Sequence, residues 1–127
     1  MLTNTDAIAT VGVRDIAAAR QFYGEVLELR EDDARSHFPD FLTYNSGAVK
    51  VLVYQSTFAG TNQATAITWD VGDRLEQVVA ALGAKGVRFE HYDMPGMRLE
   101  GDIHVAEGMK AAWLKDPDGN VLSLNGT

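Results

Sequence analysis

Short runs of alternating apolar and polar residues dominate the chain, and two stretches repeat their apolar residues at helical spacing instead. Residues 7–13 form an apolar run, which predicts a strand. Asp15 then precedes a helical stripe, and its carboxylate is placed to accept the free amides of a first helical turn. The stripe consists of Ile16, Ala19, Phe22, Tyr23 and Val26. The pattern therefore predicts a strand followed by an amphipathic helix.

Three further strands are expected in the first half. Residues 29–34 predict one strand, and a turn follows around residues 39–40. Residues 41–45 and 49–55 predict a hairpin closed by the Asn-Ser-Gly turn at 45–47. The first half is thus expected to have the order βαβββ.

The same order returns after residues 57–63, a small, polar, glycine-containing segment that is the linker candidate. Residues 64–71 predict a strand, Asp73 a second helix cap, and residues 87–90 another strand. Residues 93–108, with their mixture of glycine, methionine and charge, are expected to form a long loop. The second helical stripe consists of Leu75, Val78, Val79 and Leu82.

The C-terminal end predicts a tight hairpin. Pro117 and Asp118 suit the centre of a type I turn, and Gly119 supplies the left-handed residue that follows it. Because side chains alternate along a strand, Leu122 and Leu124 point to one face while Ser123 points to the other.

The two halves can be matched by register. An offset of 58 residues carries Val13 onto Val71 and Asp15 onto Asp73, and an offset of 71 carries Leu52 onto Ser123. The difference of 13 equals the extra length of the 93–108 region. We therefore expect an α+β fold in which one domain, residues 1–127, contains tandem βαβββ modules at 1–58 and 64–127.

Composition narrows the possible partners. The chain has 127 residues, no cysteine, no basic leader and no apolar stretch long enough to span a membrane, so we expect a cytoplasmic protein. Its net charge of −7 disfavours nucleic acid and favours cationic ligands, although the same charge also serves solubility alone.

The ordered set of strand, Asp15-capped helix with Phe22-Tyr23, and terminal Asp116-Pro117-Asp118-Gly119-Asn120 resembles the vicinal oxygen chelate superfamily. That superfamily includes glyoxalase I, extradiol dioxygenases, fosfomycin-resistance enzymes and bleomycin-resistance proteins. The resemblance covers essentially the whole chain. It implies that the βαβββ modules form a U-shaped curved sheet around a cavity, with the helices on the outer face, and that the protein is a homodimer.

Catalytic members of the family hold a divalent metal through His, Gln or Glu side chains at fixed positions. The resemblance places those positions on Ile8, Leu52, Ala66 and Ser123. Divalent ions need nitrogen or oxygen donors with some charge, which these side chains lack. We therefore expect no metal and no other cofactor.

The expected concave face carries groups that suit a bound molecule. Alternation places Trp113 and Tyr54 on that face, where aromatic rings offer a flat ligand a large contact area. The alternatives for both rings are a dimer contact or cavity filling, whereas Trp69 is expected in the core beneath a helix. The candidate ligand-binding residues are Thr10, Leu52, Tyr54, Thr68, Trp113 and Ser123.

The three histidines, His37, His91 and His104, lack the close spacing by which neighbours share an ion. His104, in the expected long loop, is the one candidate for catalysis, as a general base.

Two functions follow from these observations. The first is a metal-free protein that binds a partly aromatic or cationic small molecule, as bleomycin-resistance proteins do by sequestration. The alternative is a glyoxalase-like or dioxygenase-like enzyme, a lyase or isomerase, using atypical ligands such as His91, His104 and Glu107 or metal-free acid–base chemistry.

Overall fold

A computed structural model describes residues 1–33 and 40–127, so His37, Pro39 and the end of the strand expected at 29–34 lie outside the described residues. The chain divides into two compact units. Unit 1 contains Met1–Asn62 and Pro117–Asn120, and unit 2 contains Gln63–Asp116 and Val121–Thr127. The boundary at residues 62–63 falls inside the linker predicted from the sequence.

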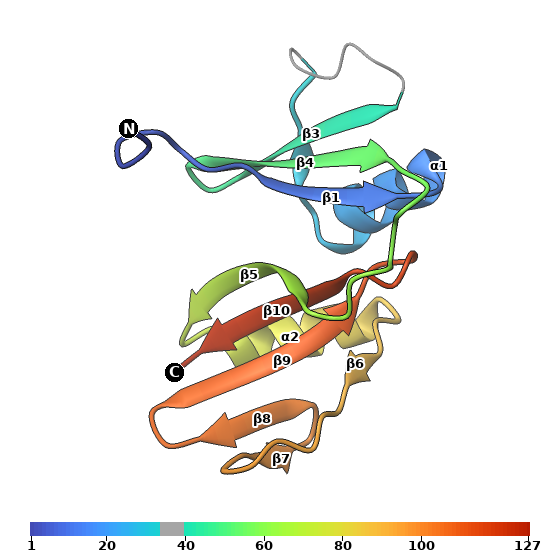
Figure 1. Ribbon diagram of the computed structural model, residues 1–127. Coiled ribbons are helices and arrows are strands. Elements are labelled where there is room, and N and C mark those ends of the chain that lie inside the picture. Colours follow the sequence, from blue (N-terminus) through green and yellow to red (C-terminus); the bar gives the residue numbers. More distant parts are fainter. Residues whose placement is uncertain (34–39) are drawn as a thin grey trace. The chain divides into compact units, whose positions relative to one another are not determined.

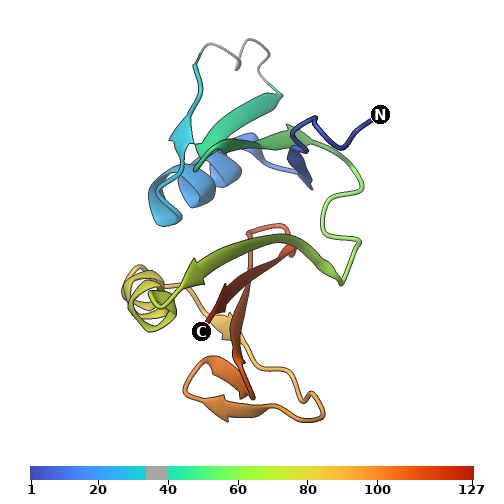
Figure 2. The same ribbon diagram turned by 90° about the vertical axis from the view of Figure 1, so that its left-hand side faces the viewer.

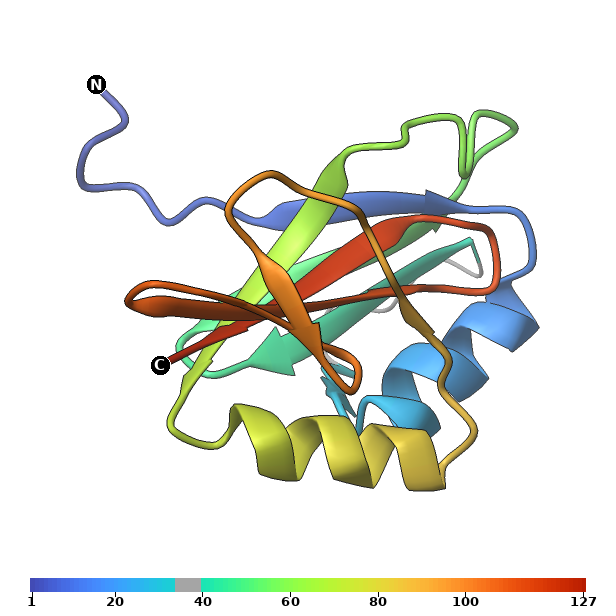
Figure 3. The same cartoon turned by 90° about the horizontal axis from the view of Figure 1, so that it is seen from below.

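Unit 1 contains a four-stranded mixed sheet in the order β1-β4-β3-β2. β1 runs parallel to β4, and the other pairs are antiparallel (Figure 1). The first residues of the chain extend away from β1 (Figure 3). The elements are β1 (Ala9–Val13), α1 (Ile16–Ala19), η1 (Arg20–Val26), β2 (Arg30–Glu31), β3 (Phe41–Ser46) and β4 (Val49–Gln55).

The helix predicted after β1 is present and begins where Asp15 indicates. The Asp15 carboxylate accepts the backbone N–H groups of Ala17 and Ala18 at 2.9 and 3.2 Å. The helix widens from α1 into η1, in which the N–H of Leu27 donates to the carbonyl of Phe22, five residues earlier, at 2.9 Å. Both Phe22 and the adjacent Tyr23 are buried against the sheet.

The turn at Pro117–Asn120 belongs to unit 1 and is tied to the end of β1. The Asp118 carboxylate accepts the N–H of Arg14 at 3.1 Å, and the Asn120 amide donates to the carbonyl of Gly12 at 2.7 Å. Gly119 has a φ of 90°, as the predicted turn requires. The terminal motif therefore closes a hairpin and also satisfies backbone groups of unit 1.

Unit 2 contains a six-stranded mixed sheet in the order β5-β10-β9-β8-β7, with β6 also paired to β9. β5 and β10 are parallel and the other pairs are antiparallel. Helix α2 lies on one side of this sheet (Figure 2). The elements are β5 (Thr65–Gly72), α2 (Leu75–Ala84), β6 (Phe89–Glu90), β7 (Arg98–Glu100), β8 (Ile103–Ala106), β9 (Met109–Lys115) and β10 (Val121–Gly126).

One face of each sheet packs under its helices. In unit 2, Leu75, Val79 and Leu82 of α2 are buried. The alternate strand positions on the same side are also buried. These strand residues are Ile67, Ala112, Leu114, Leu122 and Leu124. In unit 1 the corresponding buried strand residues are Val11, Val13, Leu42, Tyr44, Val51 and Val53.

Two sequence predictions about unit 2 are wrong. Asp73 does not cap α2, because the N–H of Arg74 bonds to the carbonyl of Val71 and the helix begins only at Leu75, without a side-chain cap. The region 93–108 is not one long loop, because β7 and β8 form an antiparallel hairpin within it. That hairpin, residues 98–106, lies within the region to which the register comparison assigns the 13 extra residues.

Trp69 lies on the predicted side of β5, in register with Leu124 and beside Ile67. Its side chain is only partly buried, so the predicted side of the strand is correct but the predicted full burial in the core is not. Two mixed, unclosed sheets with few helices confirm the α+β fold class. Among the described residues, no helix is both long enough and apolar enough to span a membrane.

Candidate functional site

The face of each sheet opposite its helices, the helix-free face, carries the residues predicted to bind a ligand. In unit 1, Thr10 is in register with Leu52, and Leu52 is in register with Thr43. In unit 2, Ser123 is in register with Thr68 on one side and with Trp113 on the other. The six predicted residues therefore form two groups of three, one in each unit.

The group in unit 1 is an aromatic pair beside small polar side chains. The Tyr54 ring stacks on Phe41 with 6.0 Å between centroids and 16° between planes. Thr10 is exposed, and its hydroxyl donates to the carbonyl of Ile8 at 3.2 Å. Phe41 was not predicted from the sequence, although the β3 alternation that buries Leu42 also puts Phe41 beside Tyr54.

The group in unit 2 is richer in directed contacts. The indole N–H of Trp113 donates to the Thr65 hydroxyl at 3.2 Å. The Ser123 hydroxyl is buried and lies 2.9 Å from the amide oxygen of Asn125, to which it donates. These two hydrogen bonds orient the Trp113 ring and the side chains of Ser123 and Asn125, which we call the polar strip. Neither bond uses a charged group.

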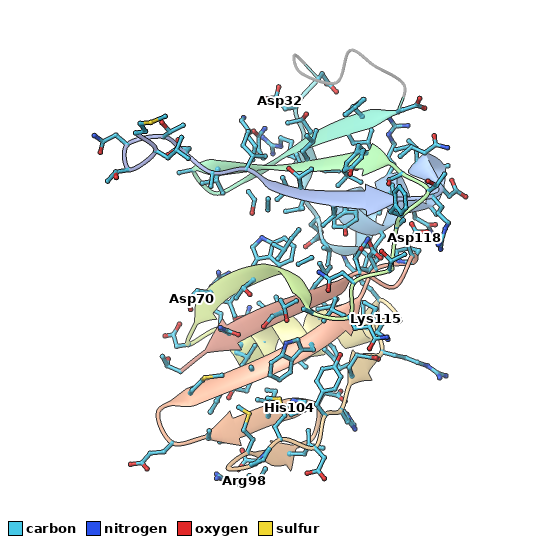
Figure 4. All side chains as sticks on the ribbon, viewed as in Figure 1. Asp32, Asp70, Arg98, His104, Lys115 and Asp118 are labelled. Carbon is cyan, nitrogen blue, oxygen red and sulfur yellow. The ribbon has the colours of Figure 1, made fainter. Side chains whose placement is uncertain are left out.

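Three rings meet next to this strip. Trp113 lies edge-on to His104 at 4.8 Å and edge-on to Tyr92 at 5.5 Å, and Tyr92 lies 6.0 Å from His104. Figure 4 labels His104 on β8 and Arg98 on the neighbouring β7. Burial, and after it the negative charge of Glu90, raises the pKa of Tyr92, so its phenol stays neutral. We call Tyr92, His104 and Trp113 the ring cluster.

His104 lies in a strand and is 1% exposed, not in a mobile loop as expected. Its Nε2 accepts the backbone N–H of Tyr92 at 2.9 Å. A neutral imidazole has one lone pair on nitrogen, and this bond uses it. A general-base role would therefore require the bond to break.

The positions of the family's metal ligands do not offer a metal site in this chain. Ile8 and Ala66 are exposed, Leu52 is partly buried, and the Ser123 hydroxyl is already hydrogen-bonded. Within residues 1–33 and 40–127, no three His, Asp or Glu side chains are grouped so that they could hold an ion. The aliphatic and hydroxyl side chains at these four positions do not fit a divalent metal ion, which needs nitrogen or charged oxygen ligands.

The three alternative metal ligands named from the sequence, His91, His104 and Glu107, each have different surroundings. His91 is exposed and lies 2.8 Å from the Asp102 carboxylate, while His104 is buried against Tyr92. Glu107 is exposed at the turn between β8 and β9.

Comparison with protein-family models matches residues 6–124 to the Glyoxalase/Bleomycin resistance protein/Dioxygenase superfamily. The chain belongs to this superfamily. The match covers both units and confirms the resemblance deduced from the sequence. Among curated proteins, no sequence matches this superfamily member.

Solved structures of the superfamily share its fold at low sequence identity. A fosfomycin resistance protein, FosX from Mesorhizobium loti, is 14% identical with a TM-score of 0.69, covering 100% of this chain and 94% of that chain. A lactoylglutathione lyase from Agrobacterium tumefaciens is 15% identical with a TM-score of 0.71, covering 99% and 96%. A superfamily member from Sphaerobacter thermophilus is 20% identical with a TM-score of 0.68, covering 100% of both chains.

Proposed function

We propose that this superfamily member binds a small, partly aromatic or cationic molecule on the helix-free face of unit 2, without a metal ion. The ring cluster carries the proposal, because it offers aromatic surface beside oriented hydroxyl and amide groups. The superfamily includes bleomycin resistance proteins, and sequestration of a ligand needs no reactive group.

Charge supports the cationic part of the proposal. The chain has eighteen acidic and eleven basic residues, and Asp70 lies beside Asn125 on the helix-free face of unit 2. Lys115, a cation near the ring cluster, is neutralised by Glu90 at 3.2 Å. A ligand with a positive group would therefore meet little repulsion. We also propose, from the family resemblance, a cytoplasmic homodimer.

The chemistry of the site favours binding over the enzymatic alternative. One superfamily neighbour is named as a lactoylglutathione lyase, so the fold can carry an enzyme. In this chain the family's ligand positions hold aliphatic and hydroxyl side chains, and the lone pair of His104 is occupied. His104 is therefore not available as a base while its bond with Tyr92 is intact.

Trp113 provides the test. Small aromatic acids, amides and amines would be titrated into the protein by calorimetry, and we expect at least one to bind with saturation. Trp113→Leu should weaken that binding at least 10-fold, because the central ring is lost. Trp69→Phe is the matched control on the opposite face and should bind as the wild type does. Absence of binding across the panel, or an unaffected Trp113→Leu variant, contradicts the proposal.

A further inference from the structure

The hydrogen bond from Tyr92 fixes the proton on His104. Nε2 accepts a backbone N–H at 2.9 Å, and an amide N–H cannot act as the acceptor. The neutral ring therefore carries its proton on Nδ1. His104 is thus presented as a donor through Nδ1 and as an acceptor through Nε2.

The donor at Nδ1 is buried and has no hydrogen-bond partner among the described residues. The whole side chain is 1% exposed. A buried donor without an acceptor is destabilising relative to one that is satisfied. A bound molecule that supplies an oxygen acceptor would recover this free energy, so the donor is prepared for a ligand.

Unit 2 has a cleft of about 320 Å³ whose lining includes two neighbours of His104. Two of its lining residues also border the imidazole. The Tyr92 ring lies 6.0 Å from the imidazole, and Leu99 is in register with His104 across β7 and β8. Residues in register on antiparallel strands point to the same face. The cleft is lined by His91, Tyr92, Asp93, Met97, Arg98 and Leu99.

Leu99 lines the cleft and is in register with His104 on the neighbouring strand. It is 44% exposed, although it is apolar and directly opposite a buried residue. An exposed leucine at the edge of a sheet can change rotamer at little cost, because few atoms pack against it. A ligand in the cleft would need Leu99 to rotate in order to reach the buried Nδ1.

We propose that the Nδ1–H of His104 recognises an sp² oxygen of the ligand, which is then an arene bearing a carbonyl or carboxylate group. The ring of this ligand packs against Tyr92 and Trp113, and its oxygen accepts the buried proton. This assignment rests on the proposed function and selects its aromatic alternative over its cationic one, because it specifies an oxygen acceptor as the polar group that the ligand must carry. His104 is then a binding residue and not a base.

Two substitutions of His104 test the roles of its two ring nitrogens separately. The amide of His104→Gln reaches the place of Nε2, so its oxygen can accept the Tyr92 N–H while the donor at Nδ1 is lost. The shorter amide of His104→Asn reaches the place of Nδ1, so a donor remains while the contact with Tyr92 is lost. A purely structural role predicts that Asn is the more damaging change, whereas ligand recognition predicts that Gln is.

The experiment uses Trp69→Phe protein, in which Trp113 is the remaining tryptophan, with benzoate, benzamide and benzylammonium as probes. We expect benzoate or benzamide to quench Trp113 with saturation and to shift the His104 Nδ1 resonance in ¹H–¹⁵N spectra. In the same background, His104→Gln should weaken binding at least 10-fold with an unchanged melting temperature, and His104→Asn should weaken it less.

Each other outcome is decisive. Binding of benzylammonium alone, or unaltered binding of benzoate and benzamide by His104→Gln, overturns the role of His104 and leaves the proposed function intact. If His104→Gln does not fold, an Nδ1 resonance that stays unmoved at saturating benzoate overturns the assignment. If none of the three probes affects Trp113, the proposed function fails as well.

Discussion

At the scale of single residues, two buried polar atoms stand out because they lack hydrogen-bond partners among the described residues: Nδ1 of His104 and the hydroxyl of Tyr44. The two differ in their surroundings. His104 lies on a helix-free face beside a cleft, whereas Tyr44 lies on the helix-facing side of its sheet, next to Tyr23 at 6.2 Å. The Nδ1 atom of His104 is the one that we propose to bind a ligand. The unpartnered hydroxyl of Tyr44 lowers the stability of the folded protein.

Tyr44 makes the stability of the fold decrease at alkaline pH. Burial, and after it the negative charge of Glu31, raises the pKa of Tyr44 from its ordinary value of 10.0 to about 12. Between these values the unfolded chain loses the proton while the folded chain keeps it, so unfolding is favoured as pH rises. The stability that protonated Tyr44 contributes to the fold is fully present below pH 10 and is lost as the pH rises toward about 12.

Tyr44→Phe should remove this alkaline loss and, at neutral pH, leave the free energy of unfolding unchanged or raise it by about 1 kcal/mol, because a buried unpartnered hydroxyl disappears. Denaturant unfolding at pH 7, 10 and 11 measures both effects. Tyr54→Phe, on the helix-free face of the same sheet, is the control and should retain the alkaline loss. A clear loss of stability in Tyr44→Phe at pH 7 would show that the hydroxyl has a partner.

At the scale of elements, the sequence predicted those features that a local pattern determines. Strands β1, β3, β4, β5, β9 and β10 follow apolar alternation, and Asp15 marks the start of the first helix. The β7–β8 hairpin was missed because its short strands lie in a segment of mixed glycine, methionine and charge, a composition that predicts a loop. The turn residues Gly101-Asp102 between them, and the alternation of Ile103 and Val105 around His104, were the available signals.

The two candidate helix caps differ although the same residue type occupies both. Asp15→Ala should destabilise the protein by about 1 kcal/mol, because two backbone N–H groups lose their acceptor. Asp73→Ala is the matched change in unit 2, where no side-chain cap is formed, and should alter stability by less than about 0.5 kcal/mol. Equal losses in the two variants, measured by denaturant unfolding, would contradict the assigned helix starts.

The candidate site was partly predictable for a related reason. Alternation alone placed Trp113 and Ser123 on one face, since strand periodicity requires no knowledge of tertiary contacts. The ring cluster was not predictable, because Tyr92 follows a two-residue strand and reaches His104 through a backbone N–H. Such a contact depends on where a chain segment lies in space.

At the scale of the whole molecule, superfamily membership fixes the fold but not the chemistry. The solved relatives are 14–20% identical to this chain. The positions that the family resemblance assigns to metal ligands hold Ile8, Leu52, Ala66 and Ser123 in this chain. The fold is thus shared with these structures, whereas the function of this chain has to be argued from its own side chains.

The dependence of ligand binding on metal tests this account most directly. The affinity of the Trp69→Phe protein for benzoate would be measured by Trp113 fluorescence after dialysis against a chelator, and again with one equivalent of zinc, nickel, manganese or ferrous iron. We expect the same saturable binding in every case, because residues 1–33 and 40–127 contain no group of His, Asp and Glu side chains that could hold an ion. Binding that disappears with the chelator and returns with a stoichiometric metal would contradict the account.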